Sequence, residues 1–153
     1  MNGYDAGIEA RNNFYEGYNC SQSVYMALAP LLGIDRVSAA RTSAFLGGGV
    51  CRTRNMCGAV LGMLMACGDA DGNTDGADQD AKGRNYREGR ELMERFISEF
   101  GSLQCRELLG IDPDAEESAQ PEARTEEYYR SRPCPGFIES AARIGQEYIE
   151  SKR

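Results

Sequence analysis

The amino-acid sequence predicts an all-α protein, folded as one compact single-domain bundle of about six helices over residues 1–153. Apolar residues recur at intervals of three and four through most segments, which is the spacing of one helix face. Residues that favour helix N-caps precede several of these segments, and glycines that end helices follow them. No segment shows the alternation of apolar and polar residues that indicates a strand. The length fits one domain, since domains usually hold roughly 100–200 residues.

Three helices are expected before the first glycine-rich segment. The first covers residues 6–15. The second begins after Asn19, a favourable N-cap, and ends at Gly33, because glycine readily adopts the left-handed conformation of a C-cap. The third begins after Asp35 and runs to about Leu46. The apolar face of the second helix is made by Val24, Leu28, Leu31 and Leu32.

A run of three glycines, residues 47–49, separates these helices from a fourth that is apolar nearly all round. We expect this helix to begin after Asn55, to cover residues 56–67 and to end at Gly68. A helix without a polar face is usually buried at the centre of a protein. Small residues four apart on one face let a neighbouring backbone approach closely. In this helix they are Gly58, Gly62 and Ala66.

The longest helix is expected over residues 79–100, with Gly101 as its C-cap. A short helix over residues 105–109 follows and ends at Gly110. The inward-facing residues of the longest helix, judged from their helical spacing, are Leu92, Met93, Phe96, Ile97 and Phe100.

A long polar connection, residues 112–133, leads to the last helix, which is expected over residues 135–151. The connection holds three of the five prolines and many acidic residues, and one helix is expected within it around residues 122–129. The last helix is amphipathic, and its buried side is made by Phe137, Ile138, Ala141, Ile144, Tyr148 and Ile149.

The polar loop before the longest helix matches the first half of a calcium-binding EF-hand loop. Residues 71–76, Asp-Gly-Asn-Thr-Asp-Gly, place oxygen ligands at alternate positions and glycine at the sixth. The second half departs from the pattern, because Lys82 stands where a bidentate glutamate is required. We therefore expect a solvated turn rather than a calcium site. The mixed charges that follow predict a solvated helix face with salt bridges, made by Arg84, Arg87, Glu88, Arg90, Glu91 and Glu94.

The net charge of −7 argues against nucleic acid and against an anionic membrane surface as partners. No signal peptide is expected, because no basic segment followed by an apolar run stands at the N-terminus. The most apolar stretch, residues 60–67, is far shorter than the roughly 20 residues that span a bilayer. A cytoplasmic location is therefore expected. In that reducing compartment cysteines are more often metal ligands, catalytic groups or free thiols than structural disulfides.

Six cysteines and no histidine are the most informative feature of the composition. Without imidazole, the chain alone can form neither a Ser-His-Asp nor a Cys-His nucleophile, and it offers no histidine ligand for zinc or haem. No Cys-x-x-Cys hook is present, so any shared site must be assembled by the tertiary fold. Three interpretations stay open: disulfides, an all-thiolate metal site, or buried inert thiols.

Four cysteines stand at or near the predicted start of a helix, and these are Cys20, Cys57, Cys105 and Cys134. A helix N-terminus carries partial positive charge and free N–H groups, which stabilise a thiolate and lower the pKa of its thiol. The positive charges of Arg52 and Arg54 would favour a thiolate or an anionic cluster. The alternative is that the cysteines are small buried apolar residues. Cys67 is the best candidate for such packing, and Cys51 is ambiguous.

The predicted fourth helix contains, near its start, the motif Cys57-Gly58-Ala59-Val60-Leu61-Gly62, and the three glycines at 47–49 precede it. Cys20 stands within Tyr-Asn-Cys-Ser-Gln, Cys105 within Cys-Arg-Glu-Leu-Leu-Gly, and Cys134 just before the last helix. In these features, and over nearly its whole length, the chain resembles the C_GCAxxG_C_C family, described as redox-active on the strength of its cysteines. Cys51 and Cys67 stand outside the family's four cysteines.

The resemblance implies a redox or electron-transfer protein whose Cys20, Cys57, Cys105 and Cys134 form one site. We expect an iron–sulfur cluster there, with Arg54 and Gly58 beside it, while two reversible disulfides are the other redox form. The partner implied is a redox protein or an oxidoreductase, and no hydrolase or transferase signature is present. A structural zinc-binding module and a helical interaction protein with inert thiols are the alternatives. A homodimer is expected only on the general frequency of two-fold dimers.

Overall fold

The computed structural model describes residues 3–153, and over these residues it is all-α, which confirms the predicted fold class. Six of its eight α-helices are longer than six residues, and a single 3-10 turn is also present. In chain order the elements are α1 (Ala6–Tyr15), α2 (Cys20–Leu32), α3 (Arg36–Ser43), η1 (Ala44–Leu46), α4 (Gly58–Asp71), α5 (Gln79–Phe100), α6 (Cys105–Leu109), α7 (Glu126–Ser131) and α8 (Cys134–Ser151).

The predicted caps explain where several helices begin and end. Asn19 forms a capping box with Gln22, in which the Asn19 side chain accepts from the Gln22 N–H at 2.9 Å and the Gln22 side chain accepts from the Asn19 N–H at 3.1 Å. Asp35 accepts from the backbone of α3 in the same way. Gly33 and Gly101 end α2 and α5 with φ angles of 71° and 88°.

Three helix predictions are wrong in their bounds. The helix expected to run from Asp35 to about Leu46 ends at Ser43, and the 3-10 turn η1 covers Ala44–Leu46. The fourth helix does not begin after Asn55, because Asn55 pairs with the preceding loop and Cys57 is the N-cap. It also does not end at Gly68 but continues to Asp71, which is held by an ion pair to Lys152 at 3.5 Å. The helix expected around residues 122–129 is α7, and it begins only after Thr125, whose hydroxyl caps it.

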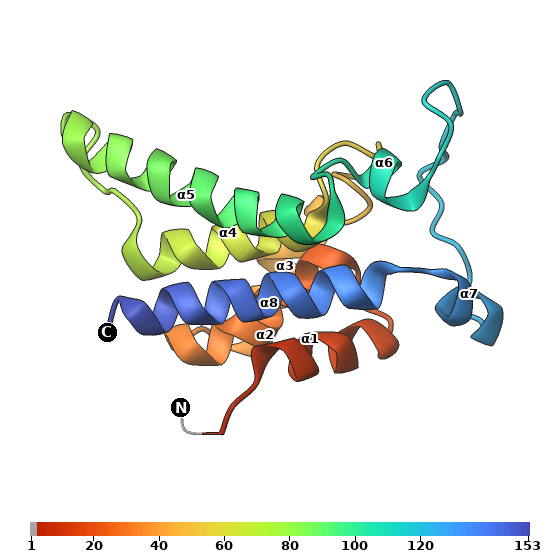
Figure 1. Ribbon diagram of the computed structural model, residues 1–153. Coiled ribbons are helices and arrows are strands. Elements are labelled where there is room, and N and C mark those ends of the chain that lie inside the picture. The colour runs from red at the N-terminus through yellow and green to blue at the C-terminus, as the bar shows by residue number, and fades with distance from the viewer. Residues whose placement is uncertain (1–2) are drawn as a thin grey trace.

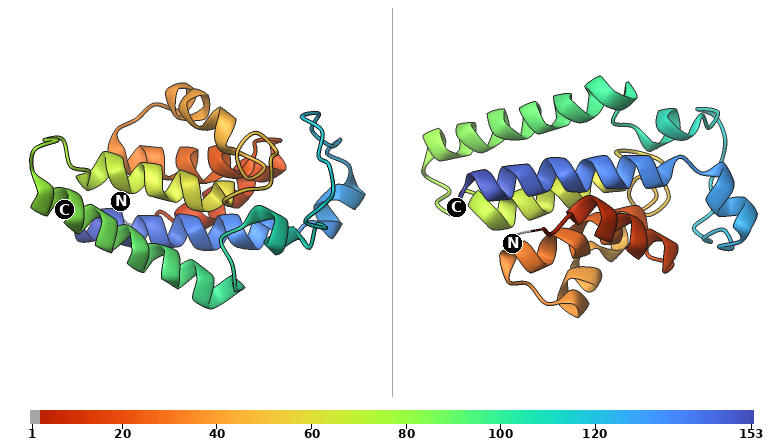
Figure 2. Two further views of the ribbon diagram at one scale, coloured as in Figure 1. Left: turned by 90° about the horizontal axis from the view of Figure 1, so that it is seen from above. Right: turned by 60° about the horizontal axis from the view of Figure 1, so that its bottom comes forward.

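The core lies between α1, α2, α4 and α8, which pack side by side (Figures 1 and 2). α4 is central, as predicted, and its Val60 and Met63 are fully buried. α5 lies on the outside of this group and inserts Leu92 and Phe96 into the core, while most of its length is exposed. None of the helices within residues 3–153 is both long and apolar enough for a membrane span.

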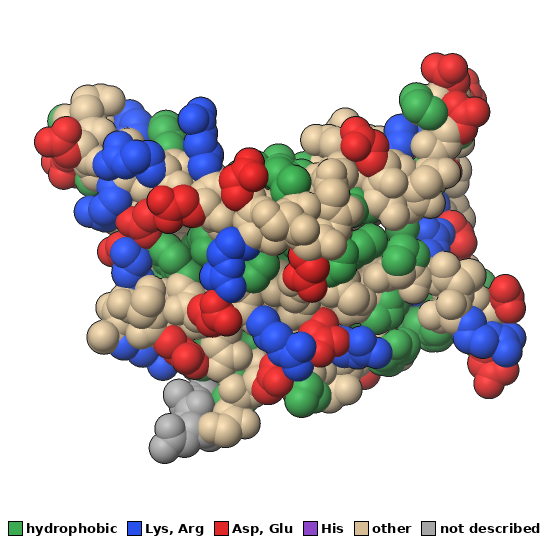
Figure 3. All heavy atoms as spheres, in the orientation of Figure 1, with side chains coloured by type: hydrophobic (Ala, Val, Ile, Leu, Met, Phe, Trp, Pro, Cys, Tyr) green, Lys and Arg blue, Asp and Glu red, His purple; other side chains and the backbone are tan. Residues whose placement is uncertain are grey.

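The exposed side of α5 carries the mixed charges that the sequence predicted (Figure 3). Arg84 pairs with Glu88 at 3.3 Å one turn along the helix. Glu88 also pairs with Lys152 of the C-terminal segment at 3.1 Å. These contacts describe a solvated helix face with local salt bridges.

α2 and α4 approach each other closely along the small residues of α4. A Cβ atom built on Gly62 would lie 2.7 Å from the carbonyl oxygen of Ser21, and one built on Gly58 would lie 3.2 Å from the Ser21 nitrogen. The predicted role of these glycines is therefore confirmed, because any side chain there would meet the backbone of α2. α2, α4 and α8 all begin at the same end of the bundle (Figures 1 and 2). Their N-termini carry three of the six cysteines to that end.

Candidate functional site

The segment before α4 forms a tight left-handed loop. Cys51 N–H donates to the carbonyl of Phe45 at 2.9 Å, and Asn55 N–H donates to that of Gly49 at 2.8 Å. Left-handed backbone is unfavourable for residues with a Cβ atom, so these contacts hold a strained segment in place. The residues with φ between 52° and 71° are Gly48, Gly49, Val50, Cys51, Arg52 and Arg54.

A short backbone pairing joins this loop to the start of α6. Cys57 N–H donates to the carbonyl of Leu103 at 2.7 Å, and Cys105 N–H donates to that of Asn55, also at 2.7 Å. The two hydrogen bonds flank an isolated antiparallel bridge between Met56 and Gln104. This pairing places Cys57 and Cys105 side by side, although no local pattern in the sequence connects them.

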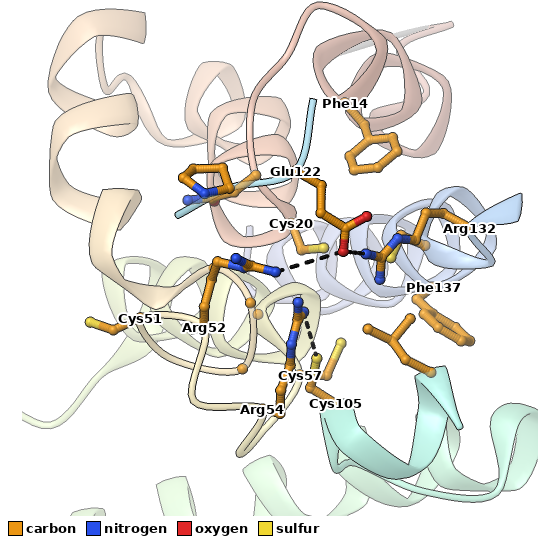
Figure 4. Close-up of a pocket in the computed structure, with 18 of the residues that line it drawn as sticks. Phe14, Cys20, Cys51, Arg52, Arg54, Cys57, Cys105, Glu122, Arg132 and Phe137 are labelled. Carbon is orange, nitrogen blue, oxygen red and sulfur yellow. Dashed lines mark hydrogen bonds and ion pairs between the residues drawn. The ribbon is translucent and has the colours of Figure 1, made fainter. Parts of the chain in front are cut away.

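One pocket of about 360 Å³ gathers the predicted site residues (Figure 4). Cys57, Cys105 and Cys134 are buried, with 4%, 8% and 7% of their surface exposed, and Cys20 is partly exposed. The four belong to the starts of α4, α6, α8 and α2, as the sequence analysis expected. The pocket is also lined by the other two predicted site residues, Gly58 and Arg54.

Cys20 and Cys134 both line the pocket, and each thiol shifts the pKa of the other. The hydrogen bond from Cys20 lowers the pKa of Cys134 below its ordinary value, and the positive charge of Arg132 acts in the same direction. The same hydrogen bond, together with burial, raises the pKa of Cys20. Cys134 is therefore the member of the pair that ionises more readily, and Cys20 holds the shared proton.

Cys57 and Cys105 form the other part of the thiol cluster and stay protonated at neutral pH. Burial raises the pKa of Cys57 to about 12, although the N–H groups of Val60 and Ala59 in the first turn of α4 oppose the shift. Burial also raises the pKa of Cys105, and Arg54 opposes that shift from a distance of 3.7 Å between Nη1 and Sγ. The cluster thus combines one acidified thiol with three whose ionisation is suppressed.

The pocket is basic although the chain is acidic. Its charged lining comprises Arg52, Arg54, Glu122, Arg124 and Arg132. The N-termini of α2, α4 and α8 add their partial positive charge at the same end. An excess of positive charge around thiols favours thiolates and other anions.

Sequence analysis identified Arg52 and Arg54 but missed Arg124, Arg132 and Glu122. Arg132 stands two residues before Cys134, so the argument from a nearby positive charge would also have identified it. Arg124 could not be identified in this way, because no cysteine stands near it in the sequence. Its guanidinium donates to the backbone of Phe14 and Tyr18, contacts that depend on the fold.

The remaining two cysteines lie apart from the cluster. Cys51 is exposed at the pocket rim, and its thiol points away from the other four and donates to the carbonyl of Phe45 at 3.3 Å (Figure 4). Cys67 is buried in the core part of α4, where burial raises the pKa of its thiol to about 12. Neither contributes a sulfur to the cluster.

The donor chemistry of the pocket suits a thiophilic metal. Four thiols face one cavity with room for a small inorganic cluster, and N–H groups and guanidinium groups surround the sulfurs. Within the part of the chain that the structure describes, no group of three cysteine, aspartate or glutamate side chains is already arranged as a metal-ligand set. All six cysteines are free thiols in the structure.

Comparison with known proteins identifies one family. A family model described as "Putative redox-active protein (C_GCAxxG_C_C)" matches residues 18–148, a segment that includes Cys20, Cys57, Cys105 and Cys134. No curated protein and no solved structure matches the chain. Because the model covers most of the sequence, the resemblance inferred from the cysteine motifs is confirmed. The chain therefore belongs to the C_GCAxxG_C_C family.

Proposed function

We propose that this protein is a thiol–disulfide redox protein in which Cys20 and Cys134 are reversibly oxidised to a disulfide. The observation that carries the proposal is that both cysteines line one pocket open to small molecules, and the opposite shifts of their two thiol pKa values support it. These shifts divide the pair into a nucleophile, Cys134, and a resolving thiol, Cys20. Such a division is what thiol–disulfide exchange requires, because the thiolate is the attacking species.

The reaction needs a disulfide as oxidant. The Cys134 thiolate attacks one sulfur of that disulfide, a new S–S bond forms, the oxidant's own S–S bond breaks, and the first thiol leaves with a proton. Cys20 then loses its proton and attacks the sulfur of Cys134. The Cys20–Cys134 disulfide forms and the second thiol is released with that proton. Two cysteines lose two electrons, and the oxidant's disulfide gains them.

The arginines support this chemistry at Cys134. Arg132, Arg54 and Arg124 all lower the pKa of Cys134 through their positive charge. A lower pKa increases the thiolate fraction near neutral pH, and it also makes Cys134 the better leaving group when the disulfide is reduced again. The partner in this proposal is a redox protein or small molecule that presents a disulfide or a dithiol, and a reducing cytoplasm would return the pair to its thiol form.

A second candidate is an iron–sulfur site. It is favoured by the placement of all four family cysteines around one pocket, with no histidine or carboxylate required as a ligand. Cys20, Cys57, Cys105 and Cys134 would hold the cluster, and Arg54 lies where it can stabilise negative charge on sulfur. When bound, a cluster would supply one-electron transfer. Zinc would use the same four thiolates without redox chemistry.

The test is to purify the protein without oxygen and to measure iron, sulfide, zinc and the visible spectrum. Metal-free protein that consumes two thiols on oxidation, with a Cys20–Cys134 bond found by peptide mass mapping, supports the thiol–disulfide function. Stoichiometric iron and sulfide would replace it with the cluster. Cys134→Ser should abolish the disulfide, whereas Cys67→Ser, at a buried cysteine outside the pocket, should leave it unchanged.

A further inference from the structure

Glu122 lies between two arginines at the wall of the pocket. It forms ion pairs with Arg52 and Arg132, and Figure 4 shows both guanidinium groups directed at its carboxylate. The arginine side chains are 17% and 15% exposed, whereas that of Glu122 is 51% exposed. The two cations are therefore part of the pocket wall, while the carboxylate reaches them from the solvent side.

Each arginine also has a contact other than its ion pair with Glu122; that of Arg132 comes from α7, and those of Arg52 come from the segment that carries Glu122. The guanidinium of Arg132 lies over the ring of Tyr128, with 4.9 Å between the guanidinium carbon and the ring centroid. Arg52 donates to the backbone carbonyls of Ser118 and Gln120. A guanidinium held in this way is pre-organised to bind a carboxylate or a phosphate, and the group that lies between these two arginines in the structure is a carboxylate, that of Glu122.

Glu122 itself belongs to a segment without regular structure. No helix is present between the end of α6 at Leu109 and the start of α7 at Glu126. The segment is held over the pocket by side-chain contacts, including the ion pair between Arg54 and Glu117 at 2.6 Å. Its carboxylates can therefore leave the arginines without breaking any helix, which makes them replaceable by an external anion.

We propose that the pocket takes small disulfides that carry carboxylate groups, and that a carboxylate of the bound molecule replaces that of Glu122 between Arg52 and Arg132. This inference rests on the thiol–disulfide function and names its substrate class. The pocket volume of about 360 Å³ lies within the range of small-molecule sites. Arg132 and Cys134 line the same pocket, so a molecule anchored at Arg132 can place its disulfide near the attacking sulfur. The exchange is the one described above, with the bound disulfide as oxidant.

Three disulfides of similar size and different charge test the substrate class: dithiodiglycolate, bis(2-hydroxyethyl) disulfide and cystamine. Their rates of oxidation of the Cys20–Cys134 pair are each divided by the rate with the unfolded chain, which removes differences in intrinsic reactivity. The folded protein should prefer the dianionic disulfide over the neutral one by about tenfold, the factor that one lost charge-assisted contact of about 1.4 kcal/mol gives. Equal normalised rates for the three would overturn the proposal.

Two of the three variants, Arg52→Gln and Arg95→Gln, are matched in charge change. Arg52→Gln should remove most of the preference, and Glu122→Gln should increase it, because an internal competitor is lost. Arg95→Gln removes the same charge from α5, where the arginine pairs with Glu147 away from the pocket, and should leave the preference unchanged. Circular dichroism verifies that each variant is folded. If Arg95→Gln lowered the preference for the dianionic disulfide as much as Arg52→Gln does, the preference would arise from general charge attraction. That result would overturn the proposed carboxylate site.

Adipate distinguishes failure of the carboxylate site from failure of the thiol–disulfide function. It carries two carboxylates at the spacing of dithiodiglycolate but has no disulfide that could react. Calorimetry should show that adipate binds the wild-type protein, binds Arg52→Gln about tenfold more weakly, and binds Glu122→Gln more tightly. Absence of adipate binding in every variant would overturn the carboxylate site even if disulfides oxidise the cysteines. Adipate binding without oxidation by any disulfide would overturn the thiol–disulfide function instead.

Discussion

The guanidinium Nη1 of Arg54 lies 3.7 Å from the Cys105 sulfur, while Nε of the same side chain donates to Glu117 at 2.6 Å. Arg54 is only 6% exposed, and its own backbone is left-handed, with φ of 63°. A strained loop therefore delivers a buried positive charge to the thiol cluster. The strain is retained because hydrogen bonds from both sides hold the loop, as occurs at many functional sites.

Removing the Arg54 charge should make Cys105 less reactive. In Arg54→Gln the hydrogen bond and charge that oppose burial most strongly are lost, and only the smaller effect of Arg132 still lowers the pKa of Cys105, so that pKa rises further. The rate of Cys105 alkylation by iodoacetamide at pH 8, followed by peptide mass spectrometry, should fall several-fold, since each pKa unit changes the thiolate fraction about tenfold. Arg84→Gln on the exposed face of α5 is the control, and an unchanged Cys105 rate in Arg54→Gln would contradict the assignment.

The thiol pair predicts an order of reactivity. In the reduced protein Cys134 should be alkylated before Cys20, because the hydrogen bond lowers the pKa of one and raises that of the other. Cys20→Ala removes that hydrogen bond and should shift the alkylation profile of Cys134 to higher pH. The profile is measured from pH 6 to 10 under reductant. A Cys134 profile that stays in place in Cys20→Ala would show that the arginines alone acidify it.

The buried thiols predict a loss of stability at alkaline pH. The pKa of Cys67 is about 12 in the folded protein and 9.0 in an ordinary setting, so only the unfolded chain releases this proton between those values. Stability is therefore complete below pH 9 and falls as the pH rises, by about 1.4 kcal/mol per such cysteine at pH 10. Urea unfolding of reduced Cys67→Ala should show a loss of stability between pH 7 and pH 10 that is smaller by that amount than the loss in the wild-type protein. An equal loss in the two proteins would contradict the prediction.

The close approach of α2 and α4 predicts opposite effects for two glycine substitutions. In Gly62→Ala the new Cβ atom would lie 2.7 Å from the Ser21 carbonyl, so α2 must move and stability should fall by about 1–3 kcal/mol. In Gly89→Ala, within α5, the nearest atom is a leucine side chain at 3.9 Å. Alanine there should stabilise by up to about 1 kcal/mol through helix propensity. Denaturant unfolding measures both, and a harmless Gly62→Ala would refute the predicted packing constraint.

The bounds of a helix were predicted well where residues within or next to that helix determine its ends. The bounds of α1, α5 and α6 agree with the prediction, because caps and apolar spacing act within a few residues. The prediction failed at Gly68 and at the start of α7. At Gly68 a contact from the distant Lys152 helps to hold the extra turn of α4. At α7, Glu122 is engaged by Arg52 and Arg132 and stays outside the helix.

The sequence by itself determined the all-α fold, the placement of Cys20, Cys57, Cys105 and Cys134 at or near helix starts, and the motif that identified the family. Only the tertiary structure decided that these starts meet at one pocket, that Cys20 and Cys134 share it, and that Cys51 points away. It also decided that Glu122 lies between two arginines. The physical reason is range: caps and periodicity arise from neighbours along the chain, whereas these contacts join distant segments and leave no periodic trace in the sequence.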